Sequence, residues 1–287
     1  MTYNFVIGGL YLAFPVLFVP LYLRVIYIFL SRRKYRAVEC YQIMIQIGIV
    51  QCVIGVTYFI EGIPALAGFD PANMGTFAVN VQSACFRIET GLSFLLALDR
   101  LLIICDVEAP KVLIKLVTVM SWLCGIVEFI LFHTPQASMF YSMTKFTTAY
   151  NYKLSLSLTV QKTGFYYTWI LSALTLLLYI IIVIFLIRER MRITTVSTNF
   201  KQKWILVQAV IRFFSDISLT FFFNIGPLFL PYSNWILGAV IAGYICNNLL
   251  LPPLLYILLN RSLRSEIFGT DFRKSIVQSI SSGMRRQ

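Results

Sequence analysis

The sequence predicts an all-α integral membrane protein, built as a bundle of seven transmembrane helices. Of its 287 residues, 59% are hydrophobic and only 13% are charged, too few polar side chains to cover a water-soluble chain of this size. The apolar residues also gather in long stretches. Seven of them reach the length of about 20 residues that a helix needs to cross the hydrocarbon core.

The seven stretches fill most of the chain, so residues 1–287 are expected to form one membrane domain. The predicted spans cover approximately residues 5–30, 38–60, 76–104, 112–132, 165–187, 204–230 and 234–258, and a tail follows over 259–287. The first three and last three spans show no repeat, so the inverted-repeat plan of many transporters is not predicted.

The basic residues give these spans a direction. Of the 24 lysines and arginines, 18 fall on the side that contains 31–37, 100–115, 188–203 and the tail. Three fall on the other side and three lie within spans. The positive-inside rule therefore predicts a plasma-membrane protein with its N-terminus outside and its tail in the cytoplasm. Because the basic residues are dispersed between apolar stretches, the net charge of +12 does not indicate a nucleic-acid partner.

No enzyme, metal site or cofactor is expected. The six cysteines all lie inside or at the ends of apolar stretches, which favours buried free thiols over disulfides. They lack CxxC spacing, and the single histidine, His133, lies in a loop, so a metal site is not indicated. Clustered catalytic side chains are also missing from the sequence.

Several charged residues fall deep inside the predicted spans, where they are costly and often functional. Arg212 and Asp216 are four residues apart and share a helix face, and Glu128 lies in the fourth span. We hypothesise that the third and sixth spans face each other and share a buried ionic cluster, with a purely structural clamp as the equal alternative. The predicted cluster contains Arg87, Glu89, Arg212 and Asp216.

Two short motifs lie at the inner ends of spans. Leu98-Asp99-Arg100-Leu101 ends the third span and resembles the Asp-Arg-Tyr motif of G-protein-coupled receptors, without its aromatic residue. Pro253 and Tyr256 resemble the end of the receptors' Asn-Pro-x-x-Tyr motif, whose proline lets the helix bend. Pro252 replaces the asparagine, so a polar bridge to the bundle would come from Asn247 or Asn248.

The resemblance implies a seven-helix bundle of the G-protein-coupled-receptor type. It implies that Asp99 restrains Arg100 at rest and that Arg100 faces a heterotrimeric G protein on activation, with Pro253 and Tyr256 as switch residues. Beyond them, Leu263, Ile267 and Phe268 alternate with basic residues, which predicts a short amphipathic eighth helix on the inner leaflet of the lipid bilayer.

A closer resemblance lies in the first two spans. Gly8-Gly-Leu-Tyr11, then Arg32-Arg-Lys34, then the segment from Cys40 to Ile49 are similar to the nematode serpentine chemoreceptors, especially class T. The chain departs from rhodopsin-like receptors in two ways. Its 133–164 loop has no cysteine for a disulfide, and its seventh span has no lysine for a retinal Schiff base.

A ligand would bind between the outer halves of the helices, where pockets are apolar with a few polar groups. The candidates are Gln82, Phe86, Tyr166, Tyr167, Trp169, Asn234 and Trp235. Since polar groups are few, a small, mostly apolar odorant or metabolite is expected. The leading hypothesis is a chemosensory receptor that activates a G protein. The alternative is a small-solute or ion transporter or channel that uses the buried Arg/Asp cluster. The sequence leaves the oligomeric state undefined.

Overall fold

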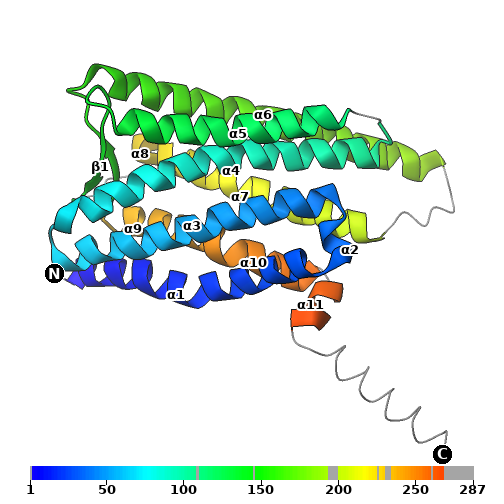
Figure 1. Ribbon diagram of the computed structural model, residues 1–287, viewed down its shortest axis with the longest axis horizontal. Coiled ribbons are helices and arrows are strands. Elements are labelled where there is room, and N and C mark those ends of the chain that lie inside the picture. The colour runs from blue at the N-terminus through cyan, green and yellow to red at the C-terminus, as the bar shows by residue number, and fades with distance from the viewer. Residues whose placement is uncertain are drawn as a thin grey trace, which may run out of the picture.

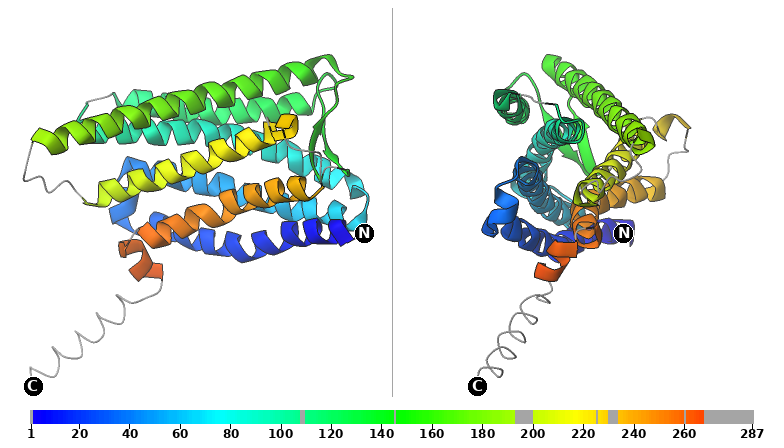
Figure 2. Two further views of the ribbon diagram at one scale, coloured as in Figure 1. Left: turned by 180° about the vertical axis from the view of Figure 1, so that it is seen from behind. Right: turned by 90° about the vertical axis from the view of Figure 1, so that its right-hand side faces the viewer.

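The computed structural model describes residues 2–107, 110–144, 146–192, 200–224, 226–229, 234–259 and 261–267. Its long helices run side by side along one direction (Figure 1), and the right-hand view of Figure 2 looks roughly along them. The first five spans are α1 (Thr2–Ser31), α3 (Glu39–Ala67), α4 (Met74–Ile104), α5 (Lys111–Phe132) and α6 (Ser155–Arg192). The last two are α7 (Phe200–Asn224) with α8 (Gly226–Phe229), and α9 (Asn234–Ile245) with η2 (Cys246–Leu250) and α10 (Leu251–Leu259).

Six helices in the described part of the chain are long and apolar enough to cross a membrane. The helix that fails this measure is α4, whose hydropathy is lowered by Arg87, Glu89, Asp99 and Arg100. It tolerates these residues because it packs against α3, α5, α6 and α7 and shows little of its surface to lipid. The chain is therefore a multi-pass membrane protein whose charged third span packs among the other helices.

The seventh span is interrupted at its centre. Residues Cys246–Leu250 form a turn of π-helix between α9 and α10, directly before Pro252 and Pro253. Prolines lack the backbone N–H that an α-helix needs and clash with the preceding turn, and π-bulges are frequent at functional sites. The wide turn places Asn247 and Asn248, both buried, toward the neighbouring helices.

The fifth span begins at Ser155, ten residues before the predicted start at 165, because the polar 155–164 segment continues the helix beyond its apolar part. The preceding segment folds into an unpredicted hairpin of β1 (Met139–Ser142) and β2 (Thr147–Tyr150). Its strands are antiparallel, with Met139 opposite Tyr150 and Ser142 opposite Thr147.

Hydrogen bonds to the helices fix the hairpin. The hydroxyl of Tyr11 in α1 donates to the carbonyl oxygen of Phe146 at 2.7 Å, and the backbone N–H of Tyr141 donates to Thr76 Oγ1 at 3.3 Å. All six cysteines of the chain are free, so packing orders this segment without a disulfide. Three of the six thiols are buried, those of Cys40, Cys52 and Cys85.

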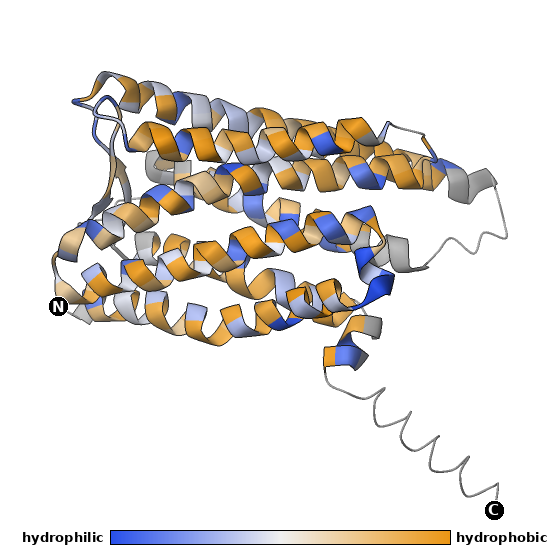
Figure 3. Cartoon of the chain, in the orientation of Figure 1, coloured by the Kyte–Doolittle hydropathy of each residue, from blue (hydrophilic) through white to orange (hydrophobic). Residues whose placement is uncertain are grey.

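The two ends of the bundle differ in character. The hairpin end carries the start of α1, the hairpin and the short 3-10 helix η1 (Pro71–Asn73). The basic end carries α2 (Arg33–Arg36) and α11 (Arg261–Ile267), where hydrophilic residues gather in Figure 3. Leu263 of α11 is fully buried and Ile267 packs beside it, so this helix lies with its apolar side against the bundle. Phe268, part of the predicted eighth helix, lies outside the described residues.

The bundle interior is closely packed around α4. Leu92 is fully buried in the main core cluster, together with Tyr11, Ile54 and Met139. The outward surfaces of α5 and α6 expose large apolar side chains such as Val112 and Ile170, as expected where helices contact lipid. Some apolar residues therefore pack in the core, and the others lie on the surface that contacts lipid.

We predict that Leu92→Ala destabilises the protein by about 2–5 kcal/mol, because a cavity remains where the buried side chain is removed. The measurement is the melting temperature of the purified protein in detergent. The matched control is Leu116→Ala, since Leu116 is 56% exposed on α5. An equal loss for both variants would contradict the core position of Leu92.

Candidate functional site

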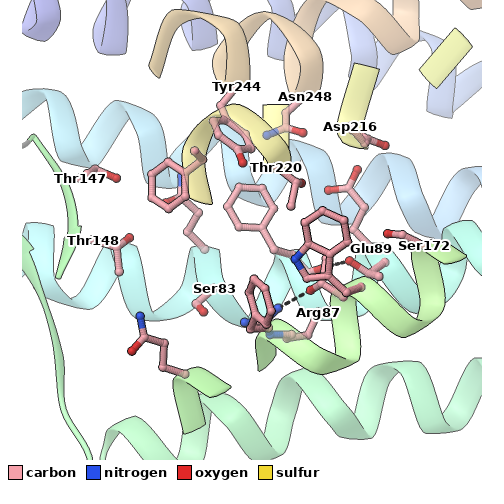
Figure 4. A pocket seen from close by; sticks show the side chains of 18 of the residues that line it. Ser83, Arg87, Glu89, Thr147, Thr148, Ser172, Asp216, Thr220, Tyr244 and Asn248 are labelled. Atoms are coloured by element: carbon pink, nitrogen blue, oxygen red, sulfur yellow. Dashed lines mark hydrogen bonds between the residues drawn. The ribbon is translucent and has the colours of Figure 1, made fainter. Parts of the chain in front are cut away.

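A cavity of about 850 Å³ opens in the hairpin half of the bundle and is lined by residues from β2 and several helices. Figure 4 shows Thr147 and Thr148 of β2 at one end of it, and Asp216 of α7 and Ser172 of α6 at the other. Tyr150, at the β2 end, is partly buried, and desolvation raises the pKa of its phenol to about 12. It therefore offers the cavity a neutral hydroxyl.

The deep end of the cavity is formed by a charged cluster. The guanidinium of Arg212 in α7 forms an ion pair with Glu89 of α4, and its Nε lies 3.6 Å from Asp216 Oδ2 one turn further along α7. The structure thus brings together three of the four residues of the expected cluster, and the third and sixth spans face each other through them.

Hydrogen bonds extend this cluster to the first two spans. The amide of Gln51, which is fully buried in α3, donates to Glu89 Oε1 at 2.6 Å. Tyr22 of α1 donates its hydroxyl to Gln51 Oε1 at 2.5 Å. Gln51 was not among the predicted residues, although a glutamine inside an apolar span indicates a buried hydrogen-bond partner.

The seventh span joins the same network through its π turn. Asn247 Nδ2 donates to Asp216 Oδ1 at 2.5 Å, and Asn248 Nδ2 donates to the hydroxyl of Tyr58 in α3 at 3.2 Å. The polar bridges expected from these two asparagines are therefore present. Five spans meet through one connected set of side chains.

Arg87 lies elsewhere, so the expectation that it belongs to the cluster with Glu89, Arg212 and Asp216 is corrected. Its Nε is 2.6 Å from Glu128 Oε2 in α5, and its Nη1 donates to the Gly164 carbonyl at 2.9 Å and to Thr168 Oγ1 at 2.6 Å in α6. Arg87 and Glu89 are two positions apart and so project from different faces of α4. A side chain at Gly164 would collide with the guanidinium, so glycine lets α6 approach it.

Of the predicted pocket residues, four line the cavity: Gln82, Phe86, Tyr166 and Trp169. Tyr167 does not, because its hydroxyl is turned to the Arg87 carbonyl at 3.4 Å. Trp235 is 73% exposed and is also absent from the lining. Asn234 begins α9, and its side chain lies outside the described residues. The prediction missed Tyr58, Tyr244 and the β2 residues, which reach the cavity only through the tertiary fold.

The Asp99–Arg100 pair lies near the basic end of α4. Arg100 Nη2 is 2.8 Å from Asp99 Oδ2, and both residues are only 2% exposed. Tyr256 of α10 is also buried, and its ring centroid lies 5.6 Å from that of Phe29 and 6.2 Å from that of Tyr22 in α1. Pro253 is buried one turn before it.

Ion pairs fix α11 at the same end. Glu266 lies 3.4 Å from Arg32 Nε and also pairs with Lys34. The connection between the first two spans and the helix after the seventh span are thus attached to each other at the basic end.

In the part of the chain that the structure describes, a bundle of long helices with charged residues on α4 and a cavity in one half defines the chain first as a multi-pass helical membrane protein. Its structure is similar to the crystal structure of squid rhodopsin, with a TM-score of 0.74 over 95% of this chain and 86% of that chain at 10% sequence identity. At that identity the likeness shows the fold.

The sequence identifies the protein family to which the chain belongs. The family model for the serpentine type 7TM GPCR chemoreceptor Srt matches residues 1–280, so the chain belongs to this family. The resemblance to class T serpentine receptors is confirmed. None of the curated proteins matches the chain.

We predict that reversing the Arg87–Glu128 pair (R87E with E128R) restores stability that each single change loses. Breaking a buried pair costs about 3–5 kcal/mol because an uncompensated charge remains in the bundle. Surface expression and melting temperature measure the effect. The control is the reversal of Arg87 with Asp216 (R87D with D216R), which should restore nothing. Rescue by this second reversal alone would contradict the pairing.

Proposed function

We propose that this chain is a chemosensory G-protein-coupled receptor that binds a small, mostly apolar ligand in the cavity and activates a heterotrimeric G protein at the basic end. The observation that carries the proposal is that α7 connects the cavity with the basic end of the bundle. Asp216 lines the cavity and, on the same helix, pairs with Arg212.

The path from the cavity continues along α7. Phe213, also a lining residue, belongs to a buried cluster with Leu206 and Ala209 of α7, Tyr179 and Ile182 of α6, and Ala97 of α4. Leu101 and Ile104, just beyond Arg100, pack against that cluster. A ligand that shifts α7 at Asp216 therefore changes packing beside Arg100.

The closed Asp99–Arg100 pair supports a resting conformation. In the receptors that this motif resembles, the acidic neighbour holds the arginine until activation releases it. Release from Asp99 would free a buried guanidinium, and the cost of leaving it unpaired favours contact with a G protein. The basic residues of the 188–203 segment, of which 193–199 lie outside the described residues, would contribute to the same docking surface.

The orientation belongs to the same proposal. The basic end carries most of the lysines and arginines. By the positive-inside rule, such an end lies on the cytoplasmic side of the plasma membrane. The cavity then opens toward the outside through the hairpin end, where a ligand arrives.

We predict that Arg100→Ala abolishes ligand-dependent signalling in cells matched for surface expression, because the contact with the G protein is lost. The measurement is a cAMP or calcium reporter in cells exposed to volatile and small-metabolite panels. The matched control is Arg24→Ala, which removes an exposed arginine from α1 and should leave the response intact. Substrate flux that survives Arg100→Ala would favour a transporter instead.

We predict that an epitope tag at the N-terminus is accessible to antibody in intact cells, whereas a tag at the C-terminus requires permeabilisation. Immunofluorescence with and without detergent measures this difference. The reverse pattern would contradict the orientation and, with it, the assignment of the cavity to the outside.

A further inference from the structure

The geometry points to a ligand that carries a protonated amine, bound with its ammonium group against Asp216 and Asn247 and its apolar body against the cavity wall. This inference rests on the proposed function, since it names the chemical class of the ligand that the same cavity accepts.

The first argument is an excess of negative charge at the deep end of the cavity. Glu89 and Asp216 share the single guanidinium of Arg212, so the cluster carries one more carboxylate than cations when all three groups are ionised. An unbalanced charge inside a membrane bundle is costly. A cationic ligand would balance it.

The second argument is that the excess carboxylate faces the cavity. Glu89 and Arg212 have side chains only 9% and 12% exposed, whereas the side chain of Asp216 is 37% exposed in the middle of the bundle. Because Asp216 lines the cavity, this exposed part is available to a ligand.

The third argument is an unused acceptor beside Asp216. Asn247 also lines the cavity and is only 4% exposed. Its amide nitrogen donates to Asp216, while its Oδ1 has no hydrogen-bond partner among the described residues. Buried acceptors normally have a partner. A carboxylate oxygen and an amide oxygen side by side match an ammonium group, which donates three hydrogen bonds and accepts none.

The other charges of the wall do not compete for this site. Arg87 is paired with Glu128 and adds no net charge. Lys162 lines the cavity but has an exposed side chain and forms no ion pair within the described residues. The remaining surface is mostly apolar and includes Phe213, Ile217 and Ile241, which suits an alkyl or aromatic body.

The experiment compares matched compounds that differ only in their head group. Hexylamine, hexanol and hexanoate form one set, and 2-phenylethylamine, 2-phenylethanol and phenylacetate form another. The full-length receptor is purified in lipid nanodiscs, and its melting temperature is measured with each compound. Binding to the folded state raises this temperature without any G protein. The same compounds are tested in the cellular reporter assay.

We expect at least one amine of the panel to raise the melting temperature, and its alcohol and acid partners to do so less or not at all. Asp216→Asn should weaken the amine by about tenfold or more, since it removes one partner of a charged pair. Asn247→Leu should weaken it less. The matched control is Glu61→Gln, which removes a buried carboxyl of α3 outside the cavity lining and should leave the amine response unchanged.

Asp216→Glu keeps the charge and should retain binding, so it tests the proposal even if Asp216→Asn fails to fold. The inference is overturned if no amine stabilises the receptor, if alcohols or acids do so better, or if Asp216→Asn leaves the amine effect unchanged. Stabilisation by sodium chloride alone, relative to N-methylglucamine chloride, would identify an inorganic cation instead. Amine binding without a reporter signal would contradict the proposed G-protein coupling but would still support this inference.

Discussion

The arrangement of the helices depends on the ion pairs that neutralise one buried guanidinium group. Arg212 lies inside a bundle surrounded by lipid, where an unpaired charge is costly, and it is stabilised by Glu89 from α4 and Asp216 from its own helix. Glu89 and Asp216 are in turn hydrogen-bonded by Gln51 and Asn247. Breaking any contact would leave another group unsatisfied, so the positions of α3, α4, α7 and the seventh span are tied together at the middle of the membrane.

A second pair completes the arrangement on the other side of α4. Arg87 binds Glu128 of α5 and two groups of α6, so α4 is fixed by charges on two faces. This explains how α4 holds charged residues at the centre of the bundle, because Arg87 and Glu89 each have a partner from another helix. The two clusters differ in balance: the Arg87 pair is neutral, whereas the Arg212 cluster has an extra carboxylate that faces the cavity. One side of α4 is thus suited to holding helices together and the other to recognising a molecule.

The sequence was sufficient for the spans because the apolar length of a membrane helix is fixed by the bilayer. It was also sufficient for the partnership of Glu89 with Arg212 and Asp216. It could not assign Glu128 to Arg87, since that choice depends on how each helix is rotated about its axis. Tyr167 and Trp235 were misplaced for the same reason. The hairpin escaped prediction because its residues are ordered by contacts with distant helices, such as Tyr11 with Phe146, rather than by a strong local pattern.

One end of the cavity is lined by a hairpin that hydrogen bonds and packing hold against the helices, with every cysteine of the chain unpaired. Its correct folding therefore requires no oxidising compartment. Cell-free synthesis into nanodiscs under reducing conditions should yield the same hairpin structure as expression through the secretory pathway. Thiol reagents in the medium should not detach the hairpin from the helices. A receptor built in this way can be produced for biophysical work without the oxidative refolding that disulfide-linked receptors demand.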